Sequence, residues 1–72
     1  MIDIRNIKIG DKVHYNPLRY IETSRKYENG IVKEIVDQEY IRVVYHCDND
    51  WENYKNYTGA MTATRDLFYG WI

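Results

Sequence analysis

Apolar and polar residues alternate along much of the chain, a pattern that predicts β-strands with one buried face and one face in water. The longest run covers residues 40–47, in which every second position holds an inward-facing residue: Ile41, Val43, Tyr45 and Cys47. Shorter runs cover residues 7–9 and 12–15, with a turn expected at Gly10-Asp11 between them. Residues 31–36 also read as a strand, but their adjacent apolar pairs predict a bulge or a sharp bend.

Turn-forming residues separate these strands. Asn16-Pro17 ends the run over 12–15, because proline has no amide hydrogen to donate to a neighbouring strand. A connection without a clear period covers residues 17–29, and its last residue begins an Asn29-Gly30 pair that predicts a tight turn. Thr64 is expected to cap a single helical turn that ends near Leu67. Residues 58–62 and 68–72 are expected to form the remaining two strands.

Composition supports this assignment. Ile and Val total 14 of the 72 residues, against two Leu and two Ala, and β-branched residues favour strands over helices. A chain of this length makes one small domain. We therefore expect an all-β fold in which residues 1–72 form one unit of five mostly antiparallel strands, with one short helical turn near residues 64–67.

In this order of elements the chain resembles a Src-homology-3-like small β-barrel of the Tudor or KOW kind. The resemblance rests on Ile9-Gly10-Asp11-Lys12-Val13, the long connection after it, the Asn29-Gly30 turn, a curved middle hairpin and the turn over 64–67. It covers nearly the whole chain, but only at the level of element order. In size and style the chain is also similar to small proteins encoded by phages and mobile elements. Most members of this barrel class are binding modules, which implies a ligand groove between residues 17–29 and 48–57.

The segment 48–57 concentrates three acids and three aromatics, which are residue types that anchor interfaces and set their charge preference. Tudor-like members bind methylated Lys or Arg in an aromatic cage by cation–π attraction. We predict a protein or peptide partner, with these contact residues: Tyr15, Tyr20, Asp48, Asp50, Trp51, Glu52, Tyr54 and Tyr57. The alternative is that the three aromatics of the segment cover one end of the small domain, on a short helical turn with Asp50 or Asn49 as its cap.

A nucleic-acid partner is the second functional hypothesis. The net charge of −1 hides an uneven distribution, because residues 1–36 hold seven basic and five acidic side chains while residues 37–72 hold three and six. Small barrels bind single strands by aromatic stacking beside a basic groove. The candidate basic face comprises Lys12, Arg19, Arg25, Lys26 and Lys33. Exposed strand edges also favour self-association.

Enzymatic and metal chemistry find little support. Cys47 is the only cysteine and falls on the inward face of its strand, which is typical of an inert buried thiol. Neighbouring His46 points to the opposite face, so the two do not suit one metal ion. We expect no enzyme activity, cofactor or metal. One thiol without an export signal or an apolar span predicts a cytoplasmic protein that does not bind membranes.

Overall fold

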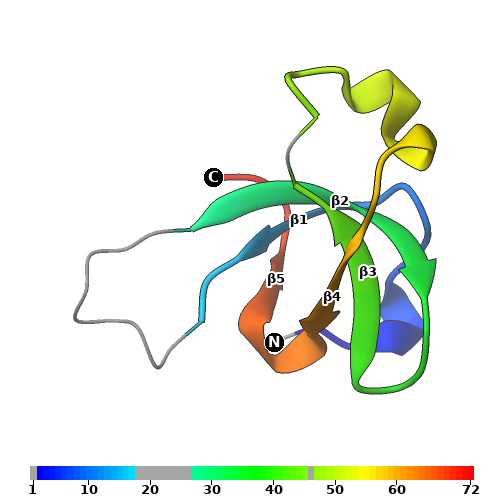
Figure 1. Ribbon diagram of the computed structural model, residues 1–72. Coiled ribbons are helices and arrows are strands. Elements are labelled where there is room, and N and C mark those ends of the chain that lie inside the picture. The colour runs from blue at the N-terminus through cyan, green and yellow to red at the C-terminus, as the bar shows by residue number, and fades with distance from the viewer. Residues whose placement is uncertain (1, 18–26, 46) are drawn as a thin grey trace.

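The computed structural model describes residues 2–17, 27–45 and 47–72 (Figure 1). Its five strands are β1 (Lys12–Tyr15), β2 (Glu28–Ile35), β3 (Tyr40–Val44), β4 (Ala60–Ala63) and β5 (Leu67–Tyr69). Short 3₁₀ helices lie between them or precede them: η1 (Ile4–Asn6), η3 (Trp51–Asn56) and η4 (Thr64–Asp66). The predicted all-β class and the predicted helical turn near residues 64–67 are both confirmed.

The strands form one curved sheet in the order β4-β3-β2-β1-β5, and each neighbouring pair is antiparallel (Figure 1). Strands β4 and β5 are the two edges, and no pairing joins them in the part of the chain that the structure describes. The strand pairing therefore shows a five-stranded antiparallel sheet, and the closed barrel expected from the sequence is not part of it.

The inner face of the sheet is filled with aliphatic side chains from all strands except β4. The largest that are fully buried are Val13, Val32, Ile41, Val43 and Leu67. Burying a side chain of this size contributes about 1.5–3 kcal/mol relative to exposing it. Val44 is as completely buried as its neighbour Val43, but it pairs with Ile31 and lies outside the core cluster that contains Val43. Successive strand residues point to opposite faces, so both faces of the sheet are covered at the end of β3.

The bulge predicted in residues 31–36 is confirmed. The register between β2 and β3 shifts between Val32 and Glu34. Before the shift the register is regular, and the adjacent residues Ile31 and Val32 are buried on opposite faces of the sheet. A bulge bends and twists its strand, which suits the long curved path of β2 across the molecule (Figure 1).

The predicted turn at Asn29-Gly30 is wrong. Both residues lie inside β2, where Asn29 pairs with His14 and Gly30 pairs with Val13. Gly30 is needed for space, because a Cβ there would lie 2.5 Å from Cγ1 of Val43. The Asn29 side chain bonds the chain end, accepting from the Ile72 amide at 3.0 Å and donating to the Ile72 carbonyl oxygen at 3.2 Å.

Two further local predictions need correction. Residues 7–9 form no strand; Gly10, with a φ of +97°, completes a tight turn in which the Asp11 amide donates to the Lys8 carbonyl at 3.0 Å. The positive φ favours glycine at this position. Thr64 does not cap η4, because Ala63 takes the capping position and makes no side-chain hydrogen bond.

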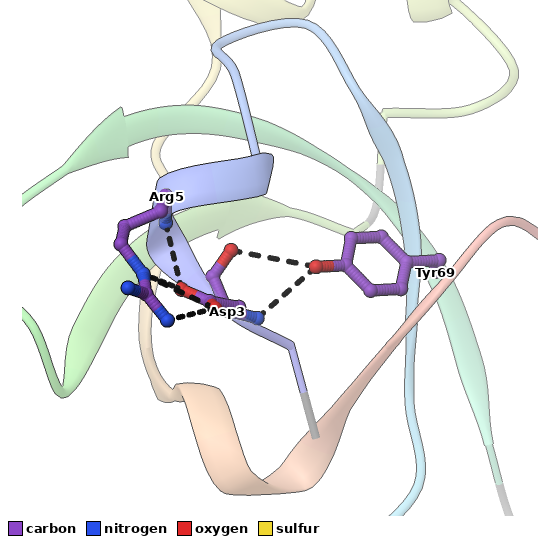
Figure 2. Close-up of polar contacts among 3 residues, drawn as sticks. All are labelled: Asp3, Arg5 and Tyr69. Carbon is purple, nitrogen blue, oxygen red and sulfur yellow. Dashed lines mark hydrogen bonds and ion pairs between the residues drawn. The ribbon is translucent and has the colours of Figure 1, made fainter.

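The N-terminal segment is fastened to β5 by polar contacts (Figure 2). The Asp3 amide donates to the Tyr69 hydroxyl at 3.1 Å, and the Arg5 guanidinium lies 2.9 Å from the Asp3 carboxylate. The hydrogen bonds from Arg5 hold the pKa of Asp3 below its usual value. The ion pair is exposed and adds little stability. Ile2, the residue before Asp3, is buried in the hydrophobic core.

Candidate functional site

The segment singled out by the sequence folds into η3, as predicted, and Asp50 organises it from within. Asp48 and Asn49 have φ values of 52° and 67°, so the chain turns sharply before the helix begins. The Asp50 carboxylate accepts hydrogen bonds from Asn53 Nδ2 at 2.9 Å and from the Tyr57 hydroxyl at 2.8 Å. The bond to Asp50 raises the pKa of Tyr57, because it favours the protonated phenol. Asp50 precedes η3 as its cap residue, although its side chain bonds no helix amide.

Trp51 packs against a second tryptophan at the C-terminus. The ring centroids of Trp51 and Trp71 are 4.8 Å apart at an interplanar angle of 54°. Trp71 in turn donates its indole N–H to the Gly30 carbonyl oxygen at 2.8 Å, and Lys12 Nζ lies 4.6 Å from the centroid of its ring. These contacts connect η3 to β1 and β2. They agree with the interpretation of the segment as a cover over one end of the sheet.

The remaining aromatics of the segment are also held by the fold. Tyr54 is half-buried, and its hydroxyl oxygen lies close to Gly10. A Cβ atom on Gly10 would be 3.2 Å from this oxygen. The Tyr57 carbonyl oxygen accepts a hydrogen bond from Lys33 Nζ. The structure thus brings Asp50 and the three predicted aromatics together, while Asp48 and Glu52 remain exposed to solvent. Tyr20 lies outside the described residues.

Tyr15 belongs to a different surface feature, a groove of about 560 Å³ along β4. Ligand sites typically occupy about 300–1,000 Å³. The groove is lined by all four residues of β4, by three tyrosines and by charged residues at its ends: Ala60, Met61, Thr62, Ala63, Tyr15, Tyr40, Tyr45, Glu28, Arg65 and Asp66. Six of these ten residues come from the stretch 60–66, and the other four lie at or next to the ends of β1, β2 and β3.

Tyr45 is a partly buried member of the groove lining, next to the buried Thr62. Its hydroxyl lies 2.9 Å from Thr62 Oγ1, and its ring stands edge-on to Tyr15 with centroids 6.0 Å apart. Burial raises the pKa of Tyr45 well above the ordinary phenol value. The phenol is therefore neutral at physiological pH, and its position is set by one hydrogen bond and one ring contact.

The rim of the groove is both apolar and charged. Met61 is 51% exposed and Tyr40 is 38% exposed, so each offers side-chain area to a ligand. Arg65 is exposed at the η4 end and makes no ion pair within residues 2–17, 27–45 and 47–72. The lining also holds the acids Glu28 and Asp66, so its charges are mixed, and its exposed apolar area suits a ligand with apolar side chains.

Sequence reasoning missed most of this groove. Tyr15 was predicted as a contact residue, but Tyr40, Met61 and Arg65 were not, and Tyr45 was assigned only to the inward face. Tyr40 and Tyr45 lie at or next to the ends of β3, Met61 lies in the edge strand β4, and Arg65 lies in η4. The pattern of one strand does not show which other strand ends beside it, so strand order was the missing information.

Two residues of the predicted nucleic-acid face can be placed. Lys12 lies over Trp71, and Lys33 donates to the Tyr57 carbonyl oxygen, so both cations contact the cover formed by η3 and the C-terminus. Arg19, Arg25 and Lys26 lie outside the described residues.

Comparison with known proteins yields no match to a family model, a curated protein or a solved structure. Among the residues that the structure describes, no three His, Cys, Asp or Glu side chains gather closely enough to hold a metal ion. The helices described here are all too short to cross a membrane.

Proposed function

We propose that this protein is a non-enzymatic binding module that recognises a peptide segment of a partner protein in the groove along β4. The observation that carries the proposal is the lining of that groove by Tyr15, Tyr40, Tyr45 and Met61. Tyrosine and methionine supply large contact areas, and both are enriched at protein interfaces. A groove that runs along a sheet edge fits an extended chain better than it fits a compact small molecule.

The order of the elements supports a Src-homology-3-like small barrel as the parent fold. A long connection follows β1, the curved hairpin β2-β3 is in the middle, and η4 precedes the short β5. Most small barrels of this kind act by binding another molecule. This role, together with the small size of the chain, fits an adaptor or an inhibitor like those encoded by phages and mobile elements. A single buried thiol, Cys47, is consistent with a reducing cytoplasm.

Selection from a random peptide library tests the proposal. Peptides of about twelve residues, long enough to follow the groove, are displayed and selected on the immobilised full chain. Binding of the recovered peptides is then measured by fluorescence anisotropy. We expect Met61→Ala and Tyr40→Ala to weaken binding about tenfold, since exposed anchors of this type dominate interface energies. Ile9→Ala is the matched control, because Ile9 is as exposed as Met61 but does not line the groove.

Other outcomes would contradict the proposal. Equal loss of binding in Ile9→Ala and Met61→Ala would show that the peptides do not use the groove. Loss only in Asp48→Lys or Glu52→Lys would move the contact surface to η3 and its acids. Failure to recover any peptide, together with oligonucleotide binding that falls steeply with salt, would favour the nucleic-acid hypothesis instead.

A further inference from the structure

The hydrogen-bond ladder shows which backbone groups of β4 face away from the sheet. Strand β4 pairs with β3 in a register that places Ala63 opposite Tyr40 and Thr62 opposite Ile41. One position further on, the Thr64 amide donates to the Glu39 carbonyl oxygen at 2.9 Å. Hydrogen-bonded pairs alternate with non-bonded pairs in an antiparallel ladder. Ala60 and Thr62 therefore bond to β3, and the N–H and C=O groups of Met61 and Ala63 point outward.

The Ala63 C=O belongs to the first turn of η4, because Ala63 is the cap residue of that helix. The Met61 N–H and C=O and the Ala63 N–H have no protein partner in the described parts of the chain, since β4 is an edge strand and no backbone bond outside the ladders and helices involves either residue. The groove follows this edge, since all four residues of β4 line it. An unpaired strand edge is a template for the backbone of another chain.

We propose that an extended segment of a partner protein binds as an added strand beside β4, with its backbone bonded to Met61 and Ala63. This inference rests on the proposed peptide-binding function and specifies how it works. The charged side chains of the lining are mixed, one positive from Arg65 and two negative from Glu28 and Asp66, so the backbone and the apolar area define the ligand. The outward Met61 N–H and C=O groups and the outward Ala63 N–H are complementary to one type of ligand, the backbone of an extended peptide.

The side chains of the added strand meet two different surfaces, because successive residues of a strand point to opposite faces. One set contacts the inner lining, where the rings of Tyr15 and Tyr45 meet edge to face. The other set contacts the outer rim formed by Tyr40 and Met61. Alternate apolar side chains in the ligand are thus expected on both sides of its backbone.

The shape of the groove favours a single segment over a second copy of this chain. Tyr15 and Glu28, from the paired ends of β1 and β2, line the groove together with β4. An added strand would lie between them and β4. The β4 edge of a second copy carries its own β3 as a neighbour, and that strand would compete for the space occupied by Tyr15 and Glu28.

Proline at residue 63 tests the backbone pairing directly. Ala63 has φ −72° and ψ 135°, which proline adopts without strain, and its amide is not used in the ladder with β3. Ala63→Pro therefore removes an outward donor while the sheet stays intact. Ala63→Ser keeps the amide and is the matched control. With the strongest peptide from the library, we expect Ala63→Pro to bind about tenfold more weakly and Ala63→Ser to bind like the wild type.

Two further measurements use the wild-type chain, so they do not depend on the folding of a variant. Amide exchange at Met61 and Ala63 should slow when the peptide binds. Of two peptides N-methylated on alternate residues, only the one whose methyl groups face β4 should lose binding.

Equal binding by Ala63→Pro, with unchanged exchange at both amides, would overturn strand addition and leave peptide binding by side chains intact. A library that yields no binding peptide would contradict the proposed function itself. Dimerisation of the peptide-free chain that Ala63→Pro abolishes would assign the edge to a second copy and overturn the inference.

Discussion

Gly30 in β2 and Tyr45 after β3 lie so close together that a Cβ on Gly30 would be only 2.9 Å from Cδ1 of Tyr45. The missing side chain leaves room for the tyrosine ring. Tyr45 in turn contacts Thr62 and Tyr15, two residues of the groove lining. The geometry of the candidate binding groove therefore depends on a glycine in a strand that does not border β4.

Gly30→Ala should destabilise the fold and disturb the groove. The added methyl group would meet Cγ1 of Val43 at 2.5 Å as well as the ring of Tyr45, and neither neighbour is the end of a flexible chain. Overpacking of this kind costs about 1–3 kcal/mol. Urea denaturation measures the loss of unfolding free energy.

A double-mutant cycle provides the control for this substitution. Val43→Ala removes the atom closest to the added methyl group, although it leaves a cavity when made alone. The double variant Gly30→Ala, Val43→Ala should be more stable than the sum of the two single losses predicts. Strict additivity would show that Gly30 serves another purpose.

Stability should fall at alkaline pH because of Tyr45. Its pKa is raised in the folded state, so above a pH of about 10 the unfolded chain releases the phenol proton first. The unfolded state then binds fewer protons, and the unfolding free energy decreases with pH by at most about 1.4 kcal/mol per pH unit from this group. Denaturation curves between neutral and alkaline pH measure the slope.

Tyr45→Phe removes this titration and is the matched control. It also loses the hydrogen bond to Thr62, so its stability near neutral pH should be lower by about 1 kcal/mol. The alkaline slope should nevertheless be shallower than that of the wild type. An unchanged slope would assign the pH dependence to other groups.

Trp51→Ala should lower stability, because the indole packs on Trp71 and joins η3 to the sheet. Losing this partly buried aromatic contact and its apolar area should lower the unfolding free energy by about 2 kcal/mol. Thermal unfolding followed by circular dichroism measures it. Glu52→Ala, an exposed neighbour on the same helix, should melt close to the wild type. If Trp51→Ala also melts like the wild type, the cover interpretation of the segment is wrong.

Cys47 should resist thiol reagents in the folded protein. The residue is 2% exposed, so a small aromatic disulfide reagent reaches it only when the chain opens. We expect slow labelling under native conditions and rapid labelling in concentrated urea. Destabilised Gly30→Ala should react faster than the wild type. Rapid stoichiometric labelling of the native protein would mean that the thiol is accessible.

Most strands could be predicted from local sequence, because alternation reflects burial on one face and needs no knowledge of neighbours. The turn at Gly10, the bulge in β2 and the two short helices at residues 51–56 and 64–66 had equally local signals. Asn29-Gly30 misled the prediction because glycine occurs both where a chain turns and where another side chain needs space. The amino-acid sequence alone does not show which of the two reasons applies to Gly30.

The candidate site was less predictable than the fold. The aromatic segment 48–57 was noticed for its composition, yet Trp51 and Tyr57 are held by contacts within the fold. Tyr40 and Met61 gave no sequence signal of comparable strength, because a single exposed tyrosine or methionine is common on protein surfaces.

The amino-acid sequence by itself determined the all-β class, the approximate strands and the buried thiol, since these follow from the period of apolar residues and from residue type. Tertiary structure decided that β4 is an edge, that its Met61 and Ala63 backbone groups face outward, and that Tyr15 and Tyr45 meet beside it. The physical reason is that strand order and ladder phase depend on contacts between residues distant in the chain. The spacing of apolar residues within one strand does not show which other strand lies beside it.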